Sequence, residues 1–207
     1  MSPIITHEDE LELASIEKTL ANKIKKLAKS QNTLINAQKK YAEDIAKTNL
    51  MRQSLNRTYR DVLKQMQVLA RESKSNIKDE EVNLFQEIIH KNDEYVEAND
   101  KYFNALKDIT IKKEYFISKK IQLADAITDM ASRRSTVIKK ALAVEKAKNK
   151  LIEGDKLNLL DQQLSDVQRA FDRSRDVFLK QVDQFLEVRN ELDALWLKLQ
   201  AVIKEFC

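Results

Sequence analysis

The 207-residue chain carries one glycine, Gly154, and one proline, Pro3, whereas these residues average roughly 7% and 5% of ordinary proteins. Charged residues make up 34% of the chain and leave a net charge of only +4, which is typical of long helices rather than of a turn-rich globule. The single cysteine, Cys207, excludes a disulfide framework. No stretch approaches the roughly 18 to 20 apolar residues that span a bilayer, and no signal layout is present. We therefore expect a cytoplasmic protein that meets any membrane from its surface.

The first predicted helix spans about residues 7–73. From Leu13 to Leu69 every seventh residue is apolar except Thr48, and such a heptad row predicts a coiled-coil seam. The row consists of Leu13, Leu20, Leu27, Leu34, Tyr41, Thr48, Leu55, Val62 and Leu69.

The second predicted helix spans about residues 79–152. A polar segment, residues 73–79, separates it from the first, and the acidic residues Asp79, Glu80 and Glu81 suit the positive end of a new helix. Its heptad row consists of Ile88, Tyr95, Tyr102, Ile109, Phe116, Leu123, Met130, Val137, Val144 and Leu151.

The third predicted helix spans about residues 155–206. Gly154 suits a left-handed cap at the end of the second helix, and Asp155 is able to cap the next one. The third heptad row consists of Leu157, Leu164, Phe171, Phe178, Phe185, Leu192 and Leu199.

These patterns predict an all-α fold over residues 1–207, with three long antiparallel helices in a left-handed coiled-coil bundle. Folding at the two turns pairs residues of the first and second helices whose numbers sum to about 154, and residues of the second and third whose numbers sum to about 308. The third helix then reaches back only to about residue 102, which leaves the first two helices uncovered beyond that point.

We expect a second chain to cover the exposed hairpin, because so large an apolar patch is not tolerated on a monomer. A homodimer, a heterodimer with a related chain, and packing against another part of a larger protein all satisfy this requirement. The predicted interface residues are Leu55, Tyr59, Val62, Met66, Leu69, Phe85, Ile88, Ile89 and Tyr95.

Charge is strongly segregated along the chain. Residues 18–64 hold 12 basic and three acidic residues, residues 112–156 hold 12 and six, and residues 79–108 hold three and nine. Basic residues near an anionic bilayer contribute about 1 kcal/mol each, so the basic regions predict a membrane-binding face. The candidate membrane-binding residues are Lys112, Lys113, Lys119, Lys120, Arg133, Arg134, Lys139, Lys140, Lys146, Lys148 and Lys150.

Charges beside an apolar seam are also what coiled coils use for solubility and partner choice, so a structural coiled-coil module that never touches lipid is the competing interpretation. Nucleic acid is not expected as a partner, because no aromatic residues interleave with the basic ones as stacking platforms. The histidines His7 and His90 lie far apart and have no metal-ligand neighbours. We therefore expect no enzyme, no metal, no cofactor and no small-molecule substrate.

The segment of residues 171–178, Phe-Asp-Arg-Ser-Arg-Asp-Val-Phe, followed by Phe185-Leu186 and Leu195-Trp196, is similar to the C-terminal ends of sorting nexins of the SNX-BAR type. Three helices of these lengths with a basic second turn also look like a BAR domain. The resemblance implies a curved dimer that senses and scaffolds phosphoinositide-containing endosomal membranes during tubule formation, protein sorting and retrograde transport.

Two features set limits on this resemblance. Such proteins carry a PX domain ahead of the BAR domain, and this chain has no pattern for one, so we expect it to be part of a longer protein. The first six residues are too short for an inserting amphipathic helix and are followed by the acidic residues Glu8, Asp9, Glu10 and Glu12. Scaffolding by a basic face is therefore the expected mode of membrane contact.

Overall fold

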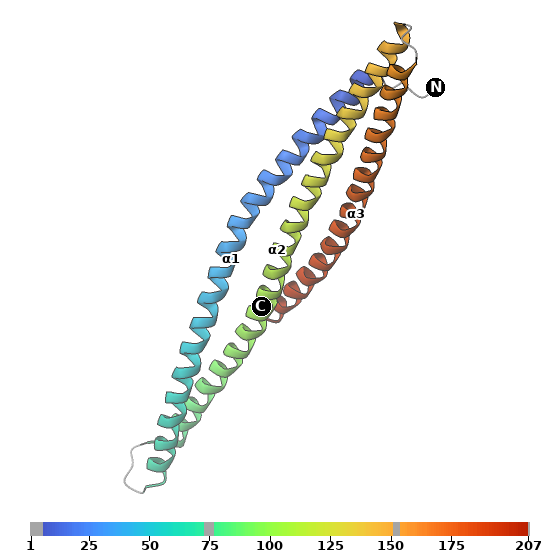
Figure 1. The fold of residues 1–207 in the computed structure, drawn as a ribbon. Coiled ribbons are helices and arrows are strands. Elements are labelled where there is room, and N and C mark those ends of the chain that lie inside the picture. Colours follow the sequence, from blue (N-terminus) through green and yellow to red (C-terminus); the bar gives the residue numbers. More distant parts are fainter. Residues whose placement is uncertain (1–5, 73–76, 151–153, 207) are drawn as a thin grey trace. The chain divides into compact units, whose positions relative to one another are not determined.

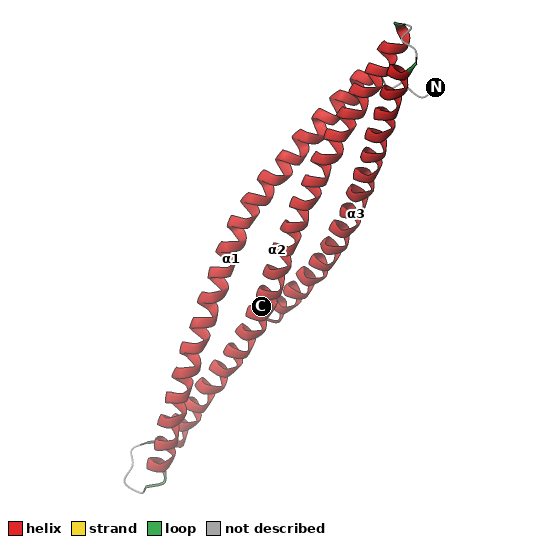
Figure 2. Cartoon of the chain, viewed as in Figure 1, coloured by secondary structure: helices red, strands yellow, loops and turns green. Residues whose placement is uncertain are grey.

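The chain folds into three helices in a computed structural model that describes residues 6–72, 77–150 and 154–206. Helix α1 spans His7–Ala70, α2 spans Asp79–Asn149 and α3 spans Asp155–Phe206 (Figure 1). The described residues contain no strand (Figure 2). The all-α fold is confirmed, with α1 and α2 each ending about three residues before the expected position. The predicted ends at Ser73 and Ile152 lie outside the described residues.

Short-range hydrogen bonds explain where each helix begins. Before α1, the Thr6 hydroxyl accepts a bond from the Asp9 backbone N–H, and the Thr6 N–H donates to the Asp9 carboxylate at 2.8 Å, a reciprocal capping box. Before α2, the Lys78 N–H donates to Glu81 Oε2. At α3 the Gly154 carbonyl accepts bonds from Leu157 and Asn158, so Gly154 rather than Asp155 occupies the capping position.

Gly154 has the expected left-handed backbone, with φ of +75°. Glycine adopts this conformation without the steric penalty that a Cβ atom brings. The prediction of a left-handed glycine is therefore confirmed, although its hydrogen bonds belong to the start of α3.

The helices divide between two compact units. Unit 1 comprises Met1–Thr33 and Lys113–Glu191, and unit 2 comprises Leu34–Lys112 and Leu192–Cys207. Each unit therefore contains a segment of all three helices.

In unit 1, α2 contacts both other helices (Figure 1). Its Lys120 donates a hydrogen bond to Gln31 of α1, and its Lys119 donates one to Gln184 of α3. The core is a cluster of Ala21, Ala124 and Ile127, on which Ile24, Leu123 and Phe178 pack. Small residues at its centre allow α1 and α2 to approach closely.

The structure corrects the predicted seam of α1. Leu20 and Leu27 are 50% and 52% exposed, whereas Ala21 and Ala28, one residue further on, are fully buried. Both rows repeat every seven residues and lie about 100° apart on the helix, so the period alone does not select between them. The buried row is Ala14, Ala21, Ala28, Ile35, Ala42, Asn49 and Asn56.

The same one-residue shift occurs on α2. Ile89 and Val96 are buried, while Ile88 and Tyr95 of the predicted row are 40% and 43% exposed. Later residues of the predicted row are buried, as predicted: Ile109, Met130 and Val144. The predicted row of α2 is therefore partly right.

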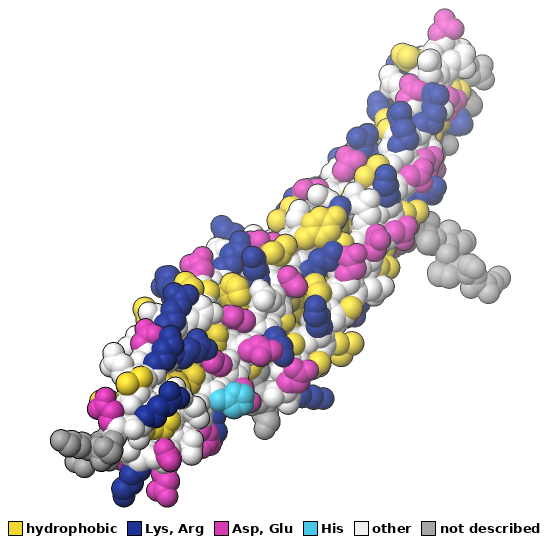
Figure 3. Space-filling model, turned by 90° about the horizontal axis from the view of Figure 1, so that it is seen from below, with side chains coloured by type: hydrophobic (Ala, Val, Ile, Leu, Met, Phe, Trp, Pro, Cys, Tyr) yellow, Lys and Arg dark blue, Asp and Glu magenta, His cyan; other side chains and the backbone are white. Residues whose placement is uncertain are grey.

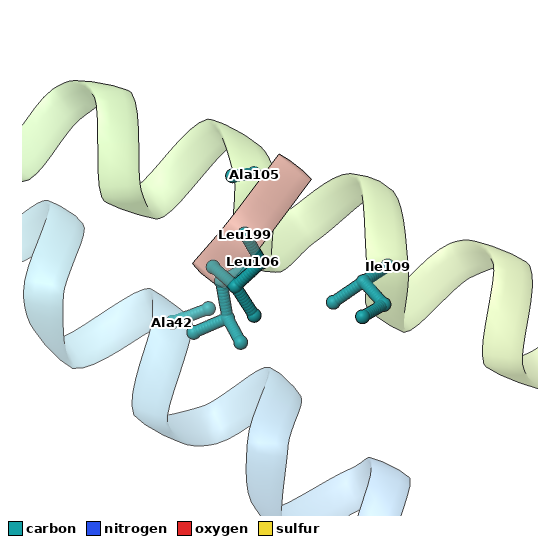
Figure 4. Packing of buried hydrophobic residues seen from close by; sticks show 5 residues of the cluster. All are labelled: Ala42, Ala105, Leu106, Ile109 and Leu199. Atoms are coloured by element: carbon teal, nitrogen blue, oxygen red, sulfur yellow. The ribbon is translucent and has the colours of Figure 1, made fainter. Parts of the chain in front are cut away.

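The core of unit 2 lies where the end of α3 meets α1 and α2. Leu199 of α3 packs with Ala42 of α1 and with Leu106 and Ile109 of α2 (Figure 4). Ile109 is fully buried.

Further along unit 2, polar pairs accompany the buried apolar residues Ile89 and Val96 between α1 and α2. The Asn49 amide donates to Asp100 at 2.7 Å, and the Asn56 amide donates to Asp93 at 2.8 Å. Asn56 lies seven residues after Asn49 on α1, and its partner Asp93 lies seven residues before Asp100 on α2. The pairing lies within a few residues of the register expected from the sequence. The two helices are antiparallel neighbours, as predicted.

Candidate partner and membrane surfaces

The end of α3 defines one edge of the exposed hairpin in unit 2. Ile203 lines an open cavity of about 350 Å³ together with Tyr95, Asn99 and Tyr102. The prediction that α3 reaches back to about residue 102 is therefore confirmed. From here to the turn, α1 and α2 pack only on each other among the described residues.

Most of the predicted interface side chains lie at the surface of this hairpin. Leu55, Val62, Leu69, Ile88 and Tyr95 are between 39% and 46% exposed. Their exposure leaves them available to a partner.

The other predicted interface residues pack within the hairpin. The Tyr59 and Phe85 rings meet edge to face with centroids 5.5 Å apart, and Met66 is half-buried. Ile89 is only 6% exposed, so its side chain packs within the hairpin and keeps little surface for a partner. Ile89 belongs to the buried row of α2, one residue after Ile88.

Sequence reasoning missed other exposed apolar residues of unit 2. Leu50, Met51 and Val68 on α1 are 58–72% exposed. They lie outside the heptad rows, so a search for seven-residue periodicity passes over them. Val68 and Leu69 line a further open cavity of about 430 Å³. The apolar surface of the hairpin is thus broader than the sequence indicated.

Several of the predicted membrane-binding residues are engaged between helices. On the α1 side, Lys120 bonds to Gln31, and Arg134 forms a salt bridge with Glu17 at 3.0 Å. Burial lowers the pKa of Lys120 below its ordinary value. Burial also raises the pKa of Glu17, and the Arg134 charge partly opposes that rise.

The side of α2 that faces α3 shows the same pattern. Lys119 bonds to Gln184 and Lys140 to Gln163, because these lysines share a heptad position with Ala126 and Ala147, which are buried. A long lysine side chain runs its apolar stem along such a contact and keeps its ammonium group at the edge.

The remaining basic residues differ in their surroundings. The pKa of Lys113 is lowered by burial, and both Lys112 and Lys113 have an interaction within the protein. Arg133 binds Asp129 on its own helix, and the hydrogen bonds from Arg133 and Ser174 lower the pKa of Asp129. Lys112, Lys113 and Arg133 therefore each have an interaction partner within the protein.

The end of α2 and the residue after it carry four exposed members of the predicted set. Lys139, Lys146, Lys148 and Lys150 all lie at the surface. Lys148 approaches Asp161 of α3 at 3.9 Å, and both side chains are about half exposed. Figure 3 shows, on one face of the molecule, hydrophobic side chains at the surface among Lys, Arg, Asp and Glu side chains.

The two histidines each lie near a carboxylate on the surface. His7 is 3.8 Å from Glu145, and His90 is 3.3 Å from Glu94. Within residues 6–72, 77–150 and 154–206, no three His, Cys, Asp or Glu side chains gather as metal ligands would. Over the same residues, no helix is long and apolar enough to span a bilayer.

Comparison of the chain with protein-family models, curated proteins and solved structures found no match. The candidate surfaces are therefore interpreted from their own geometry and chemistry.

Proposed function

We propose that the chain is a dimeric module that binds anionic membranes through basic surface residues and senses or scaffolds their curvature, in the manner of the sorting nexin BAR domains that it resembles. In that role it works on endosomal membranes, where it supports tubule formation and protein sorting. Its partner is a second copy or a related chain.

The observation that carries the proposal is the uncovered hairpin of unit 2. The end of α3 packs near Ile109 and Tyr102 and leaves Leu55, Val62 and Ile88 of the hairpin each 39–46% exposed. A contiguous apolar patch of this kind marks a protein interface. A two-fold dimer covers both copies of the patch at once.

The membrane part of the proposal is supported by the exposed end of α2. Lys139, Lys146, Lys148 and Lys150 lie within 12 residues of one another and all are exposed. A dimer doubles this charge. At about 1 kcal/mol for each lysine near an anionic surface, the paired sets suffice for binding without deep insertion.

Sedimentation velocity tests the dimer. Leu55→Asp with Ile88→Asp should convert the dimer to a monomer, because an isolated charge is not tolerated in a buried apolar interface. Leu159→Asp with Leu179→Asp is the matched control, since these α3 residues of unit 1 are 55% and 51% exposed. A wild-type chain that sediments as a folded monomer at micromolar concentration would contradict the dimer.

Co-sedimentation with phosphatidylserine vesicles tests membrane binding. Reversal of Lys139, Lys146, Lys148 and Lys150 to Glu should weaken binding by about 100-fold or more, with the dimer intact. Electron microscopy of the same mixtures should show tubules only with the wild-type chain. The control reverses four exposed lysines of unit 2 and makes the same change in net charge: Lys47, Lys64, Lys91 and Lys101. Equal binding by wild type and the Lys139 set would contradict the basic-face mechanism.

The competing function is a structural coiled-coil module that joins proteins and never touches lipid. The observation in its favour is that Lys119, Lys120, Arg134 and Lys140 are used between the helices. A chain that dimerises and binds no anionic vesicle at low salt fits this function.

A further inference from the structure

The outer face of α1 in unit 1 combines lysines with exposed leucines. Residues 18–33 contain five lysines and no acidic residue. Of these lysines, Lys25 is paired with Asp125 of α2 at 2.6 Å, whereas Lys23, Lys26 and Lys29 are exposed. This stretch therefore presents positive charge that no neighbouring carboxylate of its own helix neutralises.

The leucines of the same face are those that the helix packing leaves uncovered. Leu20 and Leu27 are 50% and 52% exposed, and Ile16 is 57% exposed. Residues three and four apart are neighbours on a helix surface, so Lys23 lies between Leu20 and Leu27. An apolar row and a lysine cluster thus share one surface of α1.

We propose that this face, formed by Leu20, Lys23, Lys26 and Leu27, binds an anionic lipid surface, with the leucines at the boundary between headgroups and acyl chains. A helix that places leucines beside lysines lies in that boundary through its apolar side and attracts anionic headgroups through its basic side. The inference rests on the proposed membrane function and assigns a contact site beyond the α2 lysines.

The composition of the face favours lipid over a helix of a partner protein. A coiled-coil seam needs apolar residues at alternating steps of three and four, but here Lys23 and Ser30 occupy the steps between the leucines. Burying Lys23 against a second helix would remove its charge from water without a partner. Against lipid, its flexible side chain extends to the headgroups.

The first test compares two leucine pairs with the same spacing. Leu20→Ser with Leu27→Ser should weaken co-sedimentation with phosphatidylserine vesicles about tenfold. Leu179→Ser with Leu186→Ser is the matched control, because these α3 residues of unit 1 also lie seven apart and are 51% and 45% exposed. Equal binding by both pairs, or dissociation of the dimer by the α1 pair alone, would overturn the lipid assignment.

The second test detects insertion directly. Leu27→Trp in a Trp196→Phe background places the only tryptophan on the proposed face. Its fluorescence should shift to the blue on phosphatidylserine vesicles and be quenched by brominated acyl chains. Binding without either change shows that the face stays out of the lipid and overturns the proposal.

The outcomes separate this inference from the proposed function. If the wild-type chain binds no anionic vesicle, both fail together. If it binds, and the Lys139 set abolishes binding while the α1 leucine pair has no effect, the proposed function stands and the α1 site is rejected. Binding of an acidic protein by the α1 face without vesicle binding would indicate a protein-docking surface instead.

Discussion

Units 1 and 2 use the same helix pair, α1 and α2, yet fill the seam between them differently. In unit 1 the buried row of α1 consists of alanines such as Ala21 and Ala28, whereas towards the hairpin end of unit 2 the row continues as Asn49 and Asn56. Alanine allows close packing of two helices under a third. Asparagine ties two helices together by hydrogen bonds to Asp100 and Asp93.

The difference shows that polar pairs enter the seam between α1 and α2 towards the hairpin end of unit 2. Where α3 packs, α1 and α2 share an apolar core, as at Ala42 and Leu199. Beyond that point each asparagine amide has a carboxylate partner, although its oxygen has none. A polar residue in a seam lowers stability but specifies register, which suits a hairpin whose apolar side chains face outward.

The largest expected effect concerns the apolar cluster of unit 2. Ile109→Ala should lower the free energy of unfolding by about 2–5 kcal/mol, since it leaves a cavity at a fully buried site. Urea denaturation followed by circular dichroism measures it. Ile111→Ala, at a side chain 55% exposed, should change stability by less than about 0.5 kcal/mol. Equal losses would show that the cluster does not hold unit 2 together.

Moving the asparagine of unit 2 into unit 1 tests the contrast between the seams. Ala28→Asn should cost about 2–3 kcal/mol, because it buries an amide at a fully buried position built for a methyl group. The reciprocal change, Asn49→Ala, should cost about 1 kcal/mol through loss of its bond to Asp100. Comparable losses in thermal or urea unfolding would remove the distinction between the two seams.

Salt bridges differ between the units in burial. Arg134→Ala in unit 1 should cost about 2 kcal/mol, since Glu17 is then left half-buried without its partner. Arg60→Ala in unit 2 should cost about 0–1 kcal/mol, because the Arg60–Asp93 pair is exposed.

The pH dependence of the Arg134→Ala variant follows from the Glu17 carboxyl, whose pKa is raised by burial. A carboxyl with a raised pKa in the folded state favours folding at low pH and loses that contribution as the pH rises through the folded value. The deficit of Arg134→Ala should therefore be greatest near pH 7 and shrink towards pH 4. A deficit that grows on acidification would contradict this assignment.

A further small effect concerns the contact between α2 and α3 in unit 1. The Ser174 hydroxyl donates to Asp129 at 2.6 Å and helps to lower the pKa of that carboxyl. Ser174→Ala should cost about 1 kcal/mol. A carboxyl whose pKa is lowered in the folded state stabilises the fold at pH values above its ordinary pKa, and this contribution is lost as the pH falls through the folded-state pKa. The cost of Ser174→Ala should therefore diminish below about pH 4. If the cost of Ser174→Ala does not depend on pH, the Ser174 side chain contributes through packing alone.

The sequence by itself determined that the chain forms three long helices, between which residues each pair of helices is joined, and, to within a few residues, which parts of α1 and α2 lie opposite one another. Scarce glycine and proline, the acidic residues at 79–81 and the seven-residue period depend on local chemistry, and local chemistry is visible in a sequence. The same reasoning placed the exposed hairpin, because the third helix is simply too short to cover it.

Only the tertiary structure decided which heptad row is buried and what each lysine does. The rows that contain Leu20 and Ala21 have the same period. The row of small residues, with Ala21, is buried because close packing of α1 against α2 favours alanine over leucine. This one-residue rotation also exposes the leucines of α1. The structure likewise places Lys119 beside Gln184 and Lys120 beside Gln31. Periodicity gives the spacing of a face, whereas its direction depends on the neighbours that pack against it.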